Sequence, residues 1–371
     1  MDKHSEFNEV VITSKKIIED FIYFQLDKLN WQDENHCFAS AGFNGPHFNL
    51  ETPVRNTCHW LVTMIIANNW LEDKEISKTI TAMANWLLEN NPYYLNGAYK
   101  MRQHPGGDCT NGVIGPSWIL ECLIRLNKYK ADDRTKNRAD EVINKLTFSK
   151  NIGLWHRFDP FTNNKKIDYT FNHQVWLAAV LAEFGKFENV DLFLNKSLGR
   201  LMQLRKNGLI KHVAFAVSMK GLLLWFIYLL RQKIDKVKIL SLEKSYHHYV
   251  LFGLARIRHF LPENKIFTSC LLRQALEYQE QFNINEYIDL PLAISYNSPG
   301  FEFPLIGFEF RKSFSTFNQN LSNTINWQIK HTFNTNRNSC LNAKDPINLT
   351  ARIYELALFV EYFSSIKECV E

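Results

Sequence analysis

Two aspartates occupy matching positions in the chain. Asp108 and Asp168 each end a long loop rich in glycine, asparagine and aromatic residues, just before a stretch with helical periodicity. Two carboxylates that face one site can divide the acid and base steps of glycosidic bond cleavage. An aspartate before a helix is also an ordinary turn or N-cap residue, so each has a structural alternative. The dipole of the following helix favours an ionised Asp168, which predicts a base-like role for Asp168 and an acid role for Asp108.

Histidine and arginine side chains accumulate in the same loops and helix starts. His173 lies in "TFNHQVW", His156 and Arg157 lie in "GLWHRFD", and Arg55 and His59 are four residues apart in "PVRNTCHW". Histidine can transfer protons near neutral pH, and arginine can hold a carboxylate through two hydrogen bonds. A lone histidine is more often structural, but these groups together favour a site for an anionic ligand. We predict that His173 is catalytic and that the other four bind the substrate, its carboxylate being held by Arg55, His156 and Arg157.

Aromatic and amide side chains in these segments suit a hydroxyl-rich ligand. Trp155 is expected to stack on a sugar ring, whereas Trp176 either stacks on the ligand or packs in the core. Two later segments, "EKSYHHYVLFGLARI" and "ISYNSPGFEFPL", are similar in kind. The further candidates for substrate binding are Asn44, Asn111, Asn172, Tyr246, His247, Tyr296 and Glu302.

The composition is that of a folded protein. The 371 residues are 46% hydrophobic and 14% aromatic, which excludes a disordered chain and permits a sizeable core. The net charge is +5 and the basic residues are dispersed, so nucleic acid is not an expected partner. Neither a phosphate-binding glycine loop nor a GxSxG or HExxH motif occurs, and the seven scattered cysteines lack zinc spacing. We therefore expect no cofactor, no metal and a cytoplasmic protein with reduced thiols; the oligomeric state stays open.

One apolar window, residues 213–230, raises the question of a membrane. It holds Lys220 near its centre and leaves "GLLLWFIYLL" as the uncharged run, which is too short to span a bilayer. The N-terminus "MDKHSEFNEV" lacks the apolar region of a signal peptide. No transmembrane segment is expected. We predict that the window is a helix buried on all sides, with a peripheral membrane contact as the alternative.

Helical periodicity predominates along the chain. Thr52 with Pro53, and Asp345 with Pro346, are typical pairs of N-cap and first helical residue. Only residues 288–310 look partly strand-like, and no linker rich in Pro, Gly or Ser divides the chain, so we predict a single domain over 1–371. The predicted helices cover 8–29, 53–69, 74–90, 113–128, 136–147, 170–185, 190–206, 213–232, 243–260, 264–281, 316–332 and 347–366.

The connections between these helices alternate in character. Short charged turns such as "NWLEDKE" alternate with long loops, which open helices near residues 53, 113 and 170, roughly 60 residues apart. In a series of antiparallel hairpins every second helix starts at the same end, so the long loops would gather on one rim. This predicts an all-α (α/α)6 toroid whose inner helices point their N-termini at one funnel. The helix at Tyr246 is out of phase, either because 213–230 disturbs the order or because this helix faces elsewhere.

Several segments resemble a known group of proteins. "CTNGVIGPSWILECLI", "GLWHRF" with "DYTFNHQVWLAAV", "YNSPGFEFPL" and "DPINLTARIYELAL" resemble α/α-toroid proteins of polysaccharide and glycosylation gene clusters, including those of archaeal N-glycosylation clusters. The resemblance spans residues 43–358. This group is distantly similar to the unsaturated glucuronyl hydrolases and to toroidal uronate lyases.

The resemblance implies a carbohydrate-active enzyme. In the unsaturated glucuronyl hydrolases two rim-loop aspartates act, and Asp108 and Asp168 match them by position before inner helices. The lyases remove the proton beside a uronate carboxyl with His, Tyr or Asn and Arg, parts that His173, Tyr246 and Arg157 could take. The expected function is hydrolysis of an acidic, uronate-containing glycan. A lyase, a C5-epimerase and a non-catalytic glycan-binding or assembly protein are the alternatives.

Overall fold

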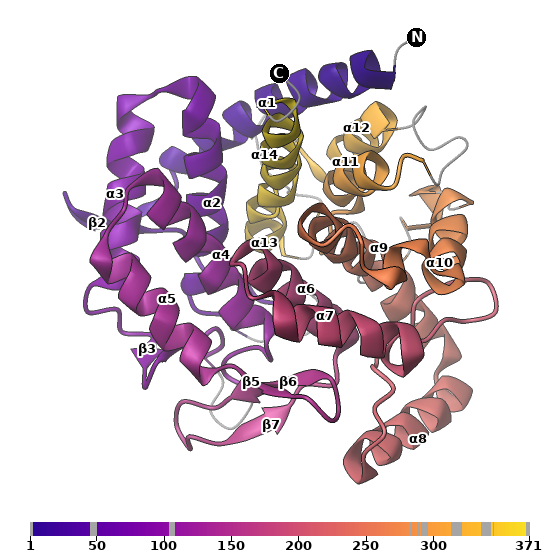
Figure 1. The fold of residues 1–371 in the computed structure, drawn as a ribbon. Helices are drawn as coiled ribbons and strands as arrows, with labels where there is room; N and C mark the ends of the chain where they lie inside the picture. The colour runs from indigo at the N-terminus through magenta and orange to yellow at the C-terminus, as the bar shows by residue number, and fades with distance from the viewer. Residues whose placement is uncertain are drawn as a thin grey trace.

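The computed structural model describes residues 3–44, 50–103, 108–281, 284–287, 290, 296–312, 321–334, 343 and 345–368. Over these residues the protein is mostly helical, and the helices form two concentric rings (Figure 1). Each inner helix contacts the next, and the last contacts the first, so the inner ring is closed. It consists of α2 (Val54–Leu71), α4 (Ile114–Tyr129), α6 (Phe171–Glu183), α9 (Lys236–Phe260), α11 (Pro299–Glu309) and α14 (Tyr354–Glu368).

The outer helices alternate with the inner ones along the chain. Inner helix α2 is buried without interruption from Val54 to Ala67, whereas outer helix α3 buries one face, as expected for a helix between core and solvent. The predicted all-α (α/α)6 toroid is confirmed. The outer ring consists of α1 (Lys3–Leu26), α3 (Lys74–Leu88), α5 (Asp133–Lys145), α7 (Phe187–Lys196), α10 (Cys270–Glu280) and α12 (Leu321–Thr332).

The two kinds of connection lie on opposite rims. Short turns lead from α2 to α3 and from α4 to α5, where Asp73 and Asp132 cap the outer helices with their side chains. The long loops lead into α2, α4 and α6, and each contains an antiparallel hairpin. These are β1 (Asn30–Asp33) with β2 (His36–Phe38), β3 (Tyr94–Leu95) with β4 (Ala98–Tyr99), and β5 (Thr147–Ser149) with β6 (Leu154–Phe158) and β7 (Lys165–Ile167).

A buried charge network holds the inner ring together near the ends of its helices at the short-turn rim. Arg256 of α9 is fully buried and pairs with Glu121 of α4 and with Glu183 of α6. Arg125 of α4 also reaches Glu183, at 3.1 Å, and Glu361 of α14. Burying these charges is costly unless each is paired, and here the pairs join helices that are distant in sequence.

Three sequence expectations are corrected. Residues 299–309 form helix α11 and not a strand, with Pro304 inside it; residues 288–289 and 291–295 lie outside the described part. Helix α7 ends at Lys196 and continues as a π-helical turn over Ser197–Leu201, so 190–206 is not one helix. The segment predicted as a fully buried helix at 213–230 is instead helix α8 (Met219–Ile234), most of which is exposed.

Helix α8 also explains the phase of Tyr246. It lies outside the double ring, and α9 then returns to the inner position (Figure 1). The extra helix therefore disturbs the alternation, and the helix that carries Tyr246 belongs to the inner ring. Among the described helices, none has both the length and the apolar run needed to cross a membrane.

Candidate active site

The carboxylate of Asp168 lies at the start of α6 and is almost fully buried. Its oxygens accept hydrogen bonds from the backbone N–H of Val113 at 3.0 Å and of Thr170 at 2.9 Å, and one oxygen lies 2.9 Å from Nδ1 of His173. Burial alone would raise the pKa of Asp168, but the charge and hydrogen bond of His173 and the two backbone donors lower it well below the usual range. Asp168 is thus an ionised group that orients the partly exposed imidazole of His173.

Asp108 is held beside Asp168 by neighbouring peptide groups. The backbone N–H of Gly112 donates to Asp108 at 2.6 Å, and the next N–H along the chain, that of Val113, donates to Asp168. Both carboxylates therefore meet at the N-terminus of α4, where the unpaired helix N–H groups favour negative charge. Nη1 of Arg157 lies 2.7 Å from Asp108 in a partly exposed ion pair.

Gly112 is required by this arrangement. Its φ of +63° is in the left-handed region, and a Cβ there would lie 2.1 Å from Oδ2 of Asp168 and 2.6 Å from Nδ1 of His173. Asn111 before it also has a positive φ, and its side chain accepts a hydrogen bond from Arg102. The loop "TNG" before α4 therefore brings the backbone into direct contact with the pair of Asp168 and His173.

Strand β6 carries three of the predicted site residues, and of these only Arg157 contacts the carboxylates. His156 directs Nδ1 to the carbonyl of Thr147 at 3.0 Å within the sheet. Trp155 is 2% exposed, and its ring packs on Phe148 and Phe193 in the outer layer. A stacking role for Trp155 would require the sheet to move.

Near the N-terminal ends of the inner helices α2 and α4, aromatic rings pack with paired cations. Arg55 is buried over the ring of Trp118 and pairs with Glu51 at 3.3 Å. Tyr296 lies beside Arg55 and donates to Asn44 at 2.8 Å. Since Arg55 already has a carboxylate partner, its guanidinium is only in part available to a substrate.

Tyr246 of α9 lies close to Arg55 and Tyr296. Burial raises the pKa of its hydroxyl, and it interacts electrostatically with Tyr296, Arg55 and Arg102. Its ring lies 5.1 Å from that of His212. The neighbouring His247 belongs elsewhere: it accepts from the N–H of Ile210 and hydrogen bonds to the carbonyl of Ala275 in outer helix α10.

The last candidate, Glu302, belongs to a buried group around Arg352. Nη2 of Arg352 lies 2.6 Å from Glu302 and also pairs with Glu355, while its other nitrogens reach Asn297 and Ser298. Burial and the proximity of Glu355 raise the pKa of Glu302 well above the usual range. These contacts connect α11 to α14 and occupy all the nitrogens of the Arg352 guanidinium. The group therefore has a structural role and is not open to a substrate carboxylate.

Several buried polar atoms of the inner helices and of the loops before them have no hydrogen-bond partner among the described residues. Both ring nitrogens of His59 are in this state, with the ring stacked 4.0 Å from that of Tyr354, and burial lowers the pKa of His59 far below its ordinary value. Oδ1 of Asn172 and Nδ2 of Asn44 are also unpartnered. Such atoms are costly unless something hydrogen bonds to them. Trp176 is fully buried and stacked on Tyr249, which is a core position.

Sequence reasoning missed residues that place the catalytic candidates. Gln174 is fully buried and bonds through its amide to the backbone of Trp155 on both sides and to the carbonyl of Asp168. Arg102, which donates to Asn111, and Glu51, which pairs with Arg55, were also missed. The sequence offered a signal for Gln174, because a glutamine directly follows His173 in an otherwise apolar helix. An isolated Arg or Glu in a loop offers no such signal. Within the described residues, no three His, Cys, Asp or Glu side chains gather as metal ligands.

Comparisons with known proteins place this geometry in context. No family model matches the chain. Archaeal glycosylation protein Q of Haloferax volcanii is 29% identical over 345 residues, which cover 87% of this chain and 92% of that protein. Cellobiose 2-epimerase from Bacillus thermoamylovorans superposes over 95% of this chain and 99% of its own, with a TM-score of 0.62 and 10% identity.

Two further structures share the fold. An unsaturated glucuronyl hydrolase specific for heparin matches 97% of this chain and 98% of its own, with a TM-score of 0.58 and 11% identity. An α-1,6-mannanase of a Salegentibacter species, in complex with α-1,6-mannotetrose, matches 94% of this chain and 99% of its own, with a TM-score of 0.54 and 9% identity. The chain is therefore a six-hairpin toroid with the fold of these sugar-active enzymes, and archaeal glycosylation protein Q is its homologue.

Proposed function

We propose that the chain is a carbohydrate-active enzyme for an anionic, uronate-containing glycan, and that its first candidate reaction is glycoside hydrolysis. The observation that supports this most is the pairing of Asp108 and Asp168 on consecutive N–H groups at the mouth of the toroid. Paired carboxylates supply the acid and the base that glycosidic cleavage needs. The name of the homologue supports a role in glycan assembly.

The roles differ because the surroundings differ. Asp168 is enclosed and ionised, so it works through His173, which it orients and whose partly exposed ring can take a proton from water or sugar. Asp108 is more accessible and has Arg157 as its counter-ion. A substrate carboxylate that draws Arg157 to itself would leave Asp108 free to take up and donate a proton. Binding of the anionic sugar would thereby make Asp108 available as the general acid.

A second candidate reaction is removal of the proton next to the uronate carboxyl, as in a lyase or a C5-epimerase. The dyad of Asp168 and His173 favours it, because an imidazole oriented by a buried carboxylate is a suitable base. Tyr246 of α9 lies near Arg55 and Tyr296 and could act on the other face of the sugar. A lyase makes an unsaturated product that absorbs in the near ultraviolet, whereas hydrolysis of a saturated glycan makes none.

A panel of uronate oligosaccharides tests the proposal. We expect one or more members to be converted, and Asp108→Asn, Asp168→Asn and His173→Ala each to lower kcat by about 100-fold or more. Asp159→Asn is the matched control, since Asp159 caps a turn in the same rim, by bonding to Phe161 and Thr162, and should not affect turnover.

A non-catalytic binding or assembly protein would give a different result. The double variant Asp108→Asn with Asp168→Asn would then retain both glycan binding and its contribution to glycan assembly. An enzyme requires that the double variant bind glycan but lose that contribution.

A further inference from the structure

Helix α8 exposes a broad apolar surface outside the toroid. Its buried face is narrow and consists of Gly221 and Tyr228, with Leu224, Trp225 and Gln232 partly covered. On the opposite side of the helix an apolar residue occurs every three or four positions, so these side chains form one continuous stripe. The exposed fractions along this stripe are 89% for Met219, 57% for Leu223, 58% for Phe226, 42% for Leu230 and 84% for Ile234. Leu222, Ile227 and Leu229 widen it.

The charges around this surface are almost all positive. Lys220 lies at the start of α8, Arg231 and Lys233 lie in its last turn, and Lys236 and Lys238 begin α9. Asp235, which caps α9 by accepting from the N–H of Lys238, is the one acidic residue between 217 and 242. A second copy packed on this helix would bring these cations together, whereas an anionic surface would complement them.

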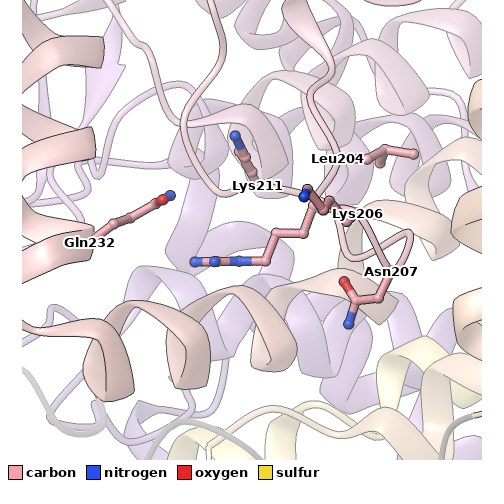
Figure 2. A pocket seen from close by; sticks show the side chains of 6 residues that line it. Leu204, Lys206, Asn207, Lys211 and Gln232 are labelled. Atoms are coloured by element: carbon pink, nitrogen blue, oxygen red, sulfur yellow. The ribbon is translucent and has the colours of Figure 1, made fainter.

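A basic pocket adjoins the helix on its inner side. It has a volume of about 410 Å³ and lies between α8 and the segment 204–211 (Figure 2). Arg205, Lys206 and Lys211 line it together with Gln232 of α8, and Figure 2 shows the side chains of Lys211 and Gln232 on either side of the space. The buried Glu243 pairs with Arg205, accepts from Tyr228 and lies near Lys211, so one carboxylate stands against the three basic residues that line the pocket. The pocket therefore adds to the positive charge of the region around α8.

We propose that α8 docks the protein on a membrane surface that carries anionic lipids. The apolar stripe enters the boundary between headgroups and acyl chains, and the flanking lysines and arginines meet the headgroup charges, as in interfacial amphipathic helices. The long basic side chains can extend to the headgroups while their stems remain on the apolar surface. None of this requires a span, and α8 crosses no bilayer.

The docking helix is connected to the rim that carries the candidate site. The chain leading to α8 runs along the start of α6, with the N–H of Phe171 donating to His212 at 2.9 Å and the N–H of Ala214 donating to Tyr169 at 2.9 Å. Asp168 directly precedes Tyr169 in the sequence, and His173 follows Phe171 by two residues. A docked protein would thus hold the start of α6, with Asp168 and His173, close to the lipid surface.

Vesicle sedimentation tests the proposal on the full chain. We expect the protein to sediment with vesicles of equal parts phosphatidylcholine and phosphatidylglycerol, and to stay in solution with phosphatidylcholine alone. Leu223→Ser with Phe226→Ser should weaken binding at least tenfold, because two apolar anchors are lost. Lys233→Gln with Lys236→Gln should weaken it by about tenfold at low salt, with little remaining difference at high salt.

Control variants separate docking from general stickiness. Ile12→Ser with Phe187→Ser removes two exposed apolar residues of the outer helices α1 and α7 and should leave vesicle binding unchanged. Equal binding to both vesicle types, or equal loss in the control, would overturn the proposal. So would light scattering that shows a dimer disrupted by Leu223→Ser with Phe226→Ser, since the stripe would then be an interface between copies. Activity is not the readout, so this test stands apart from that of the proposed function.

Discussion

Gly112 is the residue at which the candidate site is most sensitive to a single added carbon. Gly112→Ala forces a Cβ into Asp168 and His173 at a positive φ, so we expect a loss of about 2–3 kcal/mol in the free energy of unfolding and loss of any activity. Gly185→Ala is the matched control, because Gly185 has a φ of +74° but nothing within 4 Å of the added carbon. Urea denaturation of both variants separates the cost of the steric contact from the cost of the positive φ.

The control should lose about 1 kcal/mol, the cost of the left-handed backbone by itself. If the two variants are equally destabilised and the first keeps its activity, the contact of Gly112 with the pair of Asp168 and His173 does not matter, and the site has been built on the wrong residues.

His247 makes stability depend on pH. Burial lowers its pKa to about 3, so the folded protein keeps it neutral while the unfolded chain takes up a proton below pH about 6.5. The unfolded state then binds more protons, and stability falls as pH falls from 6.5 towards 3. We expect His247 to contribute a loss of about 2 kcal/mol between pH 7 and pH 5.

His247→Gln checks this contribution. Glutamine can accept from Ile210 and donate to Ala275 as histidine does, but it does not titrate. Its stability should therefore fall less steeply below pH 6.5 than that of the wild type. Parallel curves for the two proteins would show that His247 is protonated in the folded state or that the site opens.

The sequence predicted the grouping of the site better than the direction of its side chains. Asp108, Asp168, Arg157 and His173 are adjacent because loops that open successive inner helices must share a rim, and loop spacing is visible in a sequence. Trp155 points away from the carboxylates because one face of β6 packs on the outer layer of helices. This direction depends on the pairing of β6 with β5, which no local sequence pattern predicts.

At the scale of elements, inner helices were predicted well where they begin with a clear signal. Helices α2, α4 and α6 start within a residue or two of the expected 53, 113 and 170. Helix α11 was mistaken for a partial strand because Pro304 and a run of aromatic residues disfavour a helix locally, and burial within the ring overrides that preference. Helix α8 was mistaken for core because apolar composition does not tell which surface covers it.

Helices α11 and α14 depend on the ion pairs of Arg352. Removing the guanidinium leaves Glu302 and Glu355 buried without a counter-ion, so Arg352→Leu should cost about 3–5 kcal/mol of unfolding free energy at neutral pH. The loss should shrink as pH falls, since a protonated carboxyl needs no cation. Thermal denaturation across pH measures both effects.

Arg273→Leu is the control on an outer helix. Arg273 is largely exposed and lies 3.9 Å from Glu277, so its loss should barely change stability at any pH. A variant of Arg352 that is as stable as this control would mean that the network does not tie α11 to α14.

At the scale of the whole molecule, closure of the ring should make unfolding concerted. The N-terminal helix α1 packs on α14, α2 and α12, so the beginning and end of the chain complete the same double ring, as Figure 1 shows where indigo α1 meets yellow α14. Phe7 of α1 packs on Phe308 of α11 and Phe363 of α14. Within the described residues the core runs from α1 to α14, and each inner helix packs on an inner neighbour at both sides.

Phe7→Ala should therefore weaken the entire toroid and not only its N-terminal helix. We expect a loss of about 3–5 kcal/mol, with circular dichroism and tryptophan fluorescence still reporting one shared transition, since Trp86, Trp118 and Trp176 report on α3, α4 and α6. Phe187→Ala, at a half-exposed ring of α7, should hardly move that transition. If fluorescence is unchanged while helix content falls at lower denaturant, α1 unfolds by itself, and the ring is held closed by the contact of α14 with α2 alone.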